Sequence, residues 1–244
     1  KSSAFGSVSQ NSTSINTGSV VFQGRFDSTD WTGEVVAMRP NQDGSMVDLW
    51  STSETGRIPD AASRKLYTMA PGDGGKELKL VSSLTATQKT ALSSPNCSAS
   101  LTGDACALAR IDWLRGDRSK EDPAGPLRRR SKVHGDVISS SPYYVKSTNT
   151  LYVGANDGML HAIDAATGNE LFGYVPSAVF SKLYKLTQPG YSHEYFVDGE
   201  IAVSTTFETP GKNILVGALG RGGKALFALD VTDPTNFSAS KVLW

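Results

Sequence analysis

The stretch LYVGANDGMLHAIDAATGNELF, residues 151–172, gives the clearest indication of the fold of this 244-residue chain. Two apolar runs flank an Asn-Asp-Gly turn, and a second turn leads to a third run. A similar phrase, ILVGALGRGGKALFALDVTDPTNF, follows at residues 214–237. Both copies place Val-Gly-Ala before a glycine-containing turn and end the next apolar run on an aspartate, Asp164 or Asp230. This pattern is typical of antiparallel hairpins, so we expect a repeated β unit.

A third, weaker copy is VVFQGRFDSTDWTGEVVAMRPNQDGSMVDLW at residues 20–50. Repeats of about 40 to 60 residues built from strand hairpins are typical of β-propeller blades, which stack because one blade cannot bury both of its faces. The fold class is therefore mainly β, a β-propeller. At about 40 to 50 residues a blade, the chain supplies roughly five blades or fewer, and the ring is expected to be incomplete.

Short runs rich in β-branched and aromatic residues predict the individual strands. They cover residues 20–26, 34–38, 151–155, 159–164, 170–175, 213–219 and 224–231. Two short helices are expected in the connections. One covers Leu84 to Leu92, with Thr85 and Gln88 in capping-box spacing, and the other covers Pro176 to Leu186.

The overall charge of the chain favours no particular class of partner. Twenty-four basic residues balance 24 acidic ones, so no net field attracts nucleic acid or an anionic membrane. No apolar run reaches the 18 or so residues of a membrane span. The first residues lack the pattern of a signal peptide and the chain does not begin with Met, so we expect a piece of a longer protein.

Cys97 and Cys106 are the only cysteines, with eight residues between them in a turn-rich segment. Two thiols without a nearby histidine make a poor metal site, which leaves a local disulfide or two free thiols. The short loop favours the disulfide, which would indicate an oxidising compartment.

The polar residues of the repeats are interpreted as turn formers. Asn156, Asp157 and Gly158 suit a tight hairpin, and Asp164 and Asp230 suit Asx turns. A calcium loop of the D-x-[DN]-x-[DN]-G type is not present in the sequence. The segment GALGRGGK, residues 217–224, lacks the ending of a phosphate loop and precedes a strand, so we expect an inter-strand turn.

The sequence offers no pattern that supports catalysis. His134, His161 and His193 are far apart and none pairs with another at a metal-ligand spacing. His161 lies on a predicted strand, where a hydrogen-bonded core histidine is favoured over a ligand. No G-x-S-x-G motif is present. We therefore predict no catalytic residue, no bound cofactor and no metal ligand in this chain.

Two polar segments are candidate binding sites. Residues 118–132 carry several arginines, but Glu121 and Asp122 dilute the charge and aromatics are lacking, so a solvated loop is favoured over a nucleic-acid patch. Arg115, Gly116 and Asp117 form an Arg-Gly-Asp tripeptide, which can engage integrins when a loop presents it. The alternative is that Gly116 simply ends a strand or helix.

Several phrases together resemble one known family. They are FDSTDWTGEVVA (26–37), DWLRGD (112–117), LRRRSKVHGDVISSSPYYV (127–145), the repeat with its extension to Val179, YFVDGEIAV (195–203) and ILVGALGRGGKALFALDVTDP (214–234). Their order and wording resemble the C-terminal β-propeller domain of the PilY/PilC family of type IV pilus biogenesis factors and tip-associated adhesins. The resemblance covers essentially residues 1–244, which are taken as one partial domain.

The resemblance implies an exported protein of a Gram-negative bacterium, located at the cell surface, outer membrane or pilus tip. There it would work with minor pilins and the assembly machinery in pilus biogenesis, control retraction, and contact surfaces, host cells or extracellular-matrix proteins. Family members usually carry an N-terminal region and a calcium-binding loop in the propeller. Neither is found here, so calcium is an expectation for the parent protein only, and later blades are expected beyond residue 244.

Two other functions compete with tip adhesion. The pattern VGxxDGxLxAxDxxTG also resembles the blade repeat of pyrroloquinoline-quinone dehydrogenases, which bind the quinone and calcium. Those enzymes commonly carry adjacent cysteines, unlike Cys97 and Cys106, and only one unit here matches well. The third function is a pure scaffold that binds minor pilins and no host ligand.

Overall fold

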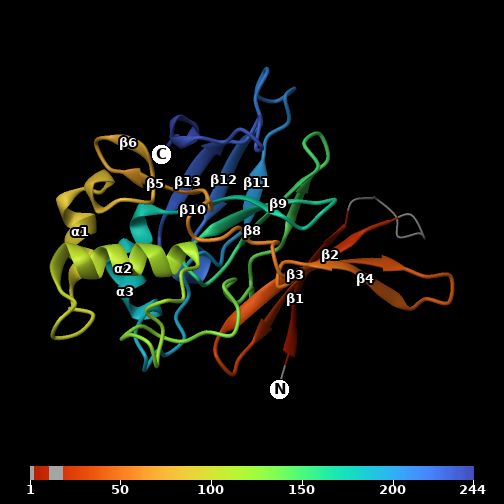
Figure 1. Ribbon diagram of the computed structural model, residues 1–244. Helices are drawn as coiled ribbons and strands as arrows, with labels where there is room; N and C mark the ends of the chain where they lie inside the picture. The colour runs from red at the N-terminus through yellow and green to blue at the C-terminus, as the bar shows by residue number, and fades with distance from the viewer. Residues whose placement is uncertain (1–2, 11–18) are drawn as a thin grey trace.

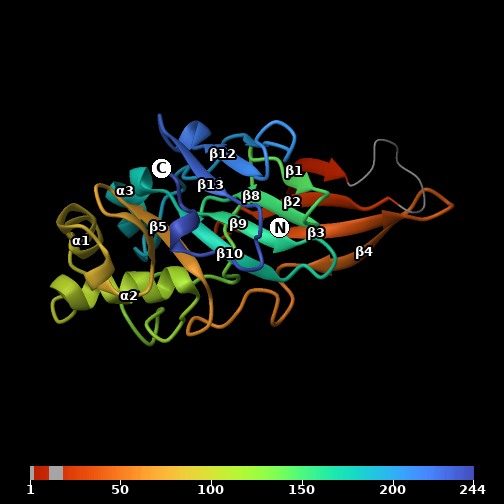
Figure 2. The same ribbon diagram turned by 90° about the horizontal axis from the view of Figure 1, so that it is seen from above.

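The computed structural model describes residues 19–244 together with the backbone of residues 3–10, and it divides the chain into three antiparallel or mixed β-sheets with three short α-helices (Figure 1). Residues 1–2 and 11–18 lie outside these ranges, and they include more than half of the leading segment that lacks a signal-peptide pattern. The helices gather at one end of the molecule, and the N-terminal sheet extends from the other end (Figures 1 and 2).

The first sheet has the order β1-β2-β3-β4 and is antiparallel throughout. Its strands are β1 (Ser3–Gln10), β2 (Val21–Asp27), β3 (Thr32–Pro40) and β4 (Met46–Ser51). This sheet contains the third copy of the repeat. The predicted strands at 20–26 and 34–38 are confirmed as β2 and β3.

The central sheet has the order β6-β5-β10-β9-β8-β7. Its strands are β5 (Leu66–Ala70), β6 (Gly74–Glu77), β7 (Tyr143–Val145), β8 (Thr150–Gly154), β9 (Leu160–Asp164) and β10 (Glu170–Val175). The repeat at residues 151–172 forms β8, β9 and the first half of β10. A parallel pairing of β10 with β5 joins this meander to a segment more than 100 residues earlier in the chain.

The C-terminal sheet has the order β11-β12-β13, and it contains the second copy of the repeat. Its strands are β11 (Ile201–Val203), β12 (Ile214–Ala218) and β13 (Leu226–Asp230). Each copy of the repeat therefore lies in a different sheet, as expected for blades.

The helices lie in the connections, as predicted. They are α1 (Ala86–Ser93), α2 (Gly103–Arg115) and α3 (Phe180–Leu186), with short 3-10 turns at Val81–Ser83, Ser177–Val179, Gly220–Gly222 and Ala239–Lys241. The capping box of Thr85 and Gln88 forms, which confirms the start of α1. The longest helix, α2, was not predicted. It ends at Gly116, whose φ of 109° suits glycine in a left-handed cap.

The central sheet is covered on both faces. Leu151 and Val153 pack with Phe22 and Trp50 of the first sheet. The intervening Tyr152 belongs to the larger core, which includes Phe227 of the C-terminal sheet and the helices. Because both faces are buried, every residue of β8 is buried and the strand shows no polar alternation. The three sheets do not close into a ring, in agreement with an incomplete propeller.

Candidate functional site: a buried cluster of histidines and carboxylates

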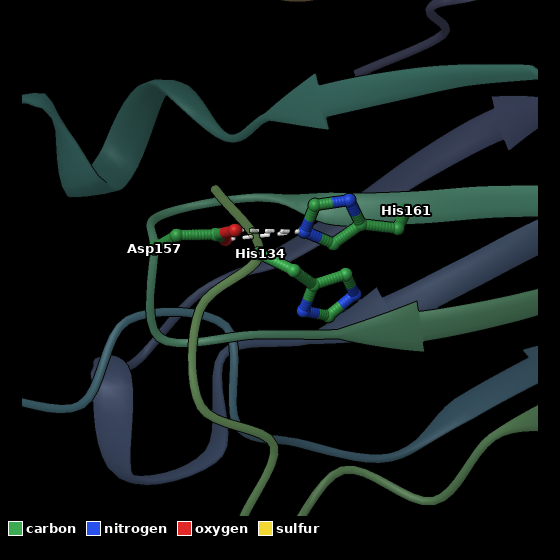
Figure 3. Close-up of side chains that lie close together, drawn as sticks. All are labelled: His134, Asp157 and His161. Atoms are coloured by element: carbon green, nitrogen blue, oxygen red, sulfur yellow. Dashed lines mark hydrogen bonds and ion pairs between the residues drawn. The ribbon is translucent and has the colours of Figure 1, made fainter. Parts of the chain in front are cut away.

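Five charged or titratable side chains meet inside the central sheet. They are Arg64, just before β5, His134 in the loop before β7, Asp157 in the β8–β9 turn, His161 on β9 and Glu170 at the start of β10. We call this set the histidine–carboxylate cluster. Each residue has less than a tenth of its surface exposed. Figure 3 shows His161 pointing toward Asp157, with the ring of His134 beside it.

His161 connects two carboxylates through its two ring nitrogens. Its Nδ1 lies 2.7 Å from Glu170 Oε1, and its Nε2 lies 3.0 Å from Asp157 Oδ2 (Figure 3). An ionised carboxylate only accepts hydrogen bonds, so both nitrogens of His161 must donate, and the ring is an imidazolium. The expectation of a hydrogen-bonded core histidine is confirmed by these contacts.

Arg64 holds the other side of Glu170. Its Nε and Nη2 donate to the two carboxylate oxygens at 2.6 and 2.8 Å, in a bidentate pair. Its Nη1 donates to the carbonyl of Leu114 at 2.9 Å. Arg64 and His161 thus balance Glu170 and Asp157, so the buried cluster carries two positive and two negative charges.

The same contacts set the pKa values of the cluster. Burial alone would lower the pKa of His161, but the carboxylates of Asp157 and Glu170 raise it to about 9. Burial would raise the pKa of Glu170, and the opposing charge of Arg64 lowers it to about 2. The pKa of Asp157 is likewise lowered, against its burial, mainly by His161. All four groups are therefore charged at neutral pH.

His134 is the neutral member of the cluster. Burial, reinforced by the positive charge of His161, lowers its pKa to about 4. Its ring stacks on that of His161, with the centroids 4.1 Å apart. Its Nδ1 lies 2.8 Å from the carbonyl oxygen of Gly135, which assigns the proton to Nδ1. The lone pair of Nε2 is then buried without a hydrogen-bond partner among the described residues.

Gly135 makes the close approach of this loop to the β8–β9 turn. Its backbone N–H donates to Asp157 Oδ2 at 2.8 Å. A Cβ at this position would lie 2.4 Å from the backbone nitrogen of Asp157. Only glycine fits here without a shift of the backbone.

His134, Asp157 and His161 could also be read as a metal site, because each offers a ligand atom within 4.8 Å of the others. Histidine and carboxylate are common ligands of zinc. In the observed arrangement, however, His161 Nε2 carries the proton that binds Asp157, and a metal would have to displace it. We therefore interpret the cluster as a compensated ion network. The absence of a metal ligand stays a prediction.

The cluster predicts how stability depends on pH. The pKa of His161 lies above the ordinary value of about 6.5, so its contribution is complete below that value and is lost as pH rises through about 9. The groups that face it are Asp157, Glu170, Arg64 and neutral His134. We expect the free energy of unfolding to fall by up to about 1.4 kcal/mol per pH unit between pH 7 and 9.

Urea denaturation monitored by tryptophan fluorescence at pH 6.5, 7.5, 8.5 and 9.5 measures this slope, with His161→Gln as the comparison. The variant should be less stable at every pH and its stability should vary less over this range. An equal slope in both proteins would contradict the assignment. His134, with its lowered pKa, acts in the opposite direction, so stability should also fall as pH drops from about 6.5 toward 4.

The turn-forming role predicted for the repeat is confirmed. The Ala155 N–H donates to the Met159 carbonyl, and Gly158 has a φ of 95°, so residues 156–158 form the hairpin turn. Asp164 Oδ1 accepts from the N–H groups of Ala166 and Thr167, as in an Asx turn. The turn reading missed that Asp157 is also buried and charged.

The predicted Asx turn at Asp230 and the predicted inter-strand turn at residues 217–224 are also confirmed. Asp230 Oδ1 accepts from the N–H and the hydroxyl of Thr232. Residues 217–224 run from β12 through a short 3-10 turn, and the strand β13 begins at Leu226. No helix follows the glycines, so the segment is an inter-strand turn.

His193 lies apart from the cluster. Its Nε2 contacts Asp136 Oδ2 at 2.8 Å, and its ring lies 4.0 Å from that of Trp31. Asp136 Oδ2 also accepts from the side chain of Asn156 at 2.8 Å. The third histidine thus supports the loops next to the β8–β9 turn. His134 and His161, which sequence spacing did not pair, are in ring contact.

The expectation of a solvated loop at 118–132 is wrong for its central residues. Arg128, Arg130 and Glu121 are buried. Arg130 Nε donates to Glu121 Oε1 at 3.0 Å, and its guanidinium lies 3.6 Å from the ring centroid of Trp113. The guanidinium of Arg128 lies 5.4 Å from the ring centroid of the same Trp113 and 4.2 Å from that of Tyr191. These arginines pack the loop against α2.

The Arg-Gly-Asp tripeptide lies at the end of α2. Arg115 is 2% exposed. Its guanidinium donates to the carbonyls of Ala61, Ala62 and Leu78. An integrin contact needs an exposed arginine, whereas this one is fully engaged inside the protein. The alternative reading, in which Gly116 ends an element, is the one that the geometry supports.

Cys97 and Cys106 form a disulfide, with their Cα atoms 5.5 Å apart. The pairing favoured from the sequence is therefore confirmed. The bond ties the loop after α1 to the first turn of α2.

Sequence reasoning missed Arg64 and Glu170 as members of the cluster. They are 106 residues apart and come together only because β10 pairs with β5. A glutamate that opens an otherwise apolar strand was the available signal, since a buried carboxylate requires a partner. No comparable signal marked Arg64.

Comparison with known proteins finds a matching family model and several similar proteins. Residues 135–244 match the model of the PilY1 beta-propeller domain. A type IV pilus biogenesis factor PilY1 homolog of Xylella fastidiosa is 35% identical over 97% of this chain and 20% of its own length. The type IV pilus biogenesis factor PilY1 of Pseudomonas aeruginosa strain PAK is 37% identical over 88% of this chain and 21% of its own length.

The chain thus spans about a fifth of the length of these curated relatives. No solved structure matches it significantly. Among the helices of the described residues, none is long and apolar enough to cross a membrane. The match of sequence over most of the chain, together with stacked sheets that carry one copy of the repeat each, agrees with the resemblance noted above. Residues 135–244 therefore match the PilY1 beta-propeller domain, and the chain is homologous to part of the type IV pilus biogenesis factor PilY1.

Proposed function

We propose that this chain is a binding module of a type IV pilus biogenesis factor, which acts by contacting minor pilins and the pilus assembly machinery. The observation that carries the proposal is the 35% identity over 97% of the chain to a type IV pilus biogenesis factor. The parent protein would be exported to the surface of a Gram-negative bacterium, where it supports assembly, retraction control and attachment. The disulfide of Cys97 and Cys106 fits an oxidising, extracytoplasmic location.

Binding rather than catalysis is supported by the state of the charged cluster. His161 and Asp157 have no contact with solvent that a substrate could use, since they are 0% and 5% exposed. Their charges are neutralised within the cluster, by Glu170 and Arg64 among others. Such a network rigidifies the central sheet and leaves the function to surface loops.

Capture of purified pilins tests the proposal. The chain is fixed to a sensor surface and exposed separately to minor pilins, to the major pilin and to host extracellular-matrix proteins. We expect saturable binding of at least one minor pilin, and none to a heat-unfolded sample of the same chain. If the folded chain binds no pilin, the proposal is wrong.

The other arms of the experiment separate the finer functions. Binding to extracellular-matrix proteins as well as to pilins would support adhesion, whereas binding to pilins alone would limit the chain to a scaffold role. A dye-linked alcohol oxidation assay with added quinone and calcium tests the enzyme reading. Any turnover above that of the heat-unfolded sample would contradict a non-enzymatic function.

A further inference from the structure

A cavity of about 390 Å³ lies beside the disulfide, where the loops at 96–97, 126–127 and 187–190 meet α2. Its lining is partly apolar, at Pro126, Leu127 and Pro189, and partly polar. It includes Asn96, Cys97, Arg110, Thr187, Gln188 and Gly190. Asn96 and Gly190 are exposed and form the rim, and Arg110, which is 2% exposed, forms the inner wall. The size is that of a small-ligand pocket.

Arg110 is held rigidly but is not fully used. Its Nε donates to Thr187 Oγ1 at 3.1 Å, and its Nη1 donates to the Leu92 carbonyl at 2.6 Å. Its guanidinium lies 5.7 Å from the ring centroid of Tyr184. Its Nη2 has no hydrogen-bond partner among the described residues, and it is not enclosed by protein.

The charge of Arg110 has no carboxylate to balance it. Arg64 and Arg130, which are equally buried, pair with Glu170 and Glu121. Arg115 is also without a carboxylate contact, but carbonyl groups accept from all of its donor nitrogens. Within the part of the chain that the structure describes, no acidic side chain lies within ion-pair distance of Arg110.

The lack of a counter-charge is reflected in the pKa of Arg110. Burial lowers the pKa of Arg110 to about 10, and only Tyr184 acts in the other direction. A buried cation without a counter-charge is unfavourable unless an anion completes the site. Thr187 strengthens the case for a built site, because its hydroxyl donates to the Tyr184 carbonyl at 2.7 Å and is thereby oriented to accept from Arg110.

We propose that this cavity binds a small oxyanion, a carboxylate or a phosphate, through the free Nη2 of Arg110. The amide side chains of Asn96 and Gln188 at the rim are donors for the remaining oxygens. The charged hydrogen bond supplies the affinity, and the rigid guanidinium supplies the direction. The site does not depend on the pilus function proposed above.

Gly190 allows a test at the rim that leaves Arg110 and Thr187 unchanged. A Cβ at Gly190 meets no atom within 4 Å, so a short side chain is accommodated there. Gly190→Asp places a negative charge at the rim, where it competes with the anion for Arg110. Gly190→Asn has the same shape without the charge and is the matched control.

The measurement is the NMR shift of the Arg110 side-chain Nε–H during titration with sodium acetate or with inorganic phosphate, with sodium chloride keeping ionic strength constant. We expect a saturable shift with at least one of the two anions, which also identifies the preferred chemistry. Affinity should fall about fivefold or more in Gly190→Asp and stay within about twofold in Gly190→Asn. Equal affinities in the two variants, or a shift that does not saturate with either anion, would overturn the proposal.

Discussion

Replacing Glu170 by Gln is expected to lower the free energy of unfolding by about 3–5 kcal/mol. The change removes one charge from a buried group that faces two cations, Arg64 at 2.6 Å and His161 at 2.7 Å. The amide is nearly the same size as the carboxylate, so the packing of β10 is kept. What remains is excess positive charge in the interior, because Asp157 alone must balance both cations.

Urea denaturation at pH 7 measures the effect, and Glu54→Gln is the matched control. Glu54 forms an ion pair with Arg57 at 2.7 Å, but its side chain is 47% exposed. Solvent screens that pair, so its loss should leave the midpoint nearly unchanged. If the two variants are equally stable, the cluster does not hold the central sheet together.

The Glu170 variant should also shift the titration of its neighbour. Without that carboxylate, the pKa of His161 should fall from about 9 toward the ordinary value, because one of the two charges that raise it is gone. NMR titration of the histidine ring then distinguishes an electrostatic role for Glu170 from a packing role. An unchanged pKa would mean that the glutamate acts only by filling space.

Replacing Trp113 by Ala is expected to cost about 3–5 kcal/mol of stability. Trp113 is 1% exposed, and its indole N–H donates to the Arg128 carbonyl at 2.9 Å. The guanidinium of Arg130 lies on its ring at 3.6 Å. Truncation leaves a cavity at the end of α2 and removes the surface on which loop 118–132 packs.

Trp244→Ala is the control for the loss of an indole, because Trp244 is 55% exposed. Chemical denaturation should show a large decrease in midpoint for Trp113→Ala and a small one for the control. Limited proteolysis gives a second measurement, since release of the loop should expose the bonds around Arg129. Equal midpoints and equal protease resistance would show that the loop is held by other contacts.

Local sequence was sufficient for the repeated strands, because their signals are local. Apolar runs separated by Asn-Asp-Gly or Asp-Gly turns specify hairpins. The paired strands lie within about 20 residues of each other, as in β8 with β9. The capping box of α1 is equally local. The helix α2 was not predicted because its apolar residues do not form a separate face. Arg110 and Arg115 are buried together with the apolar side chains.

The charged cluster, in contrast, could not be read from the sequence. Arg64 meets Glu170 through the parallel pairing of β5 with β10, and His134 meets His161 because glycine at 135 lets the loop approach the turn. A solvated loop was predicted at residues 118–132 because charge composition does not reveal which side chains pair with one another in the folded protein. Glu121 and Trp113 provide a carboxylate and a ring surface, which make burial of the arginines favourable.

The repeated hairpin and the family resemblance of this protein could be read from its sequence, and the disulfide was favoured, since each depends on residues that are close in the chain or on a pattern of residue types. The neutralisation of charges in the core, and the lack of a counter-charge at Arg110, became visible only in the folded protein. The physical reason is that burial and pairing depend on contacts between distant segments, and the energy of a charge depends on those contacts more than on its neighbours in sequence.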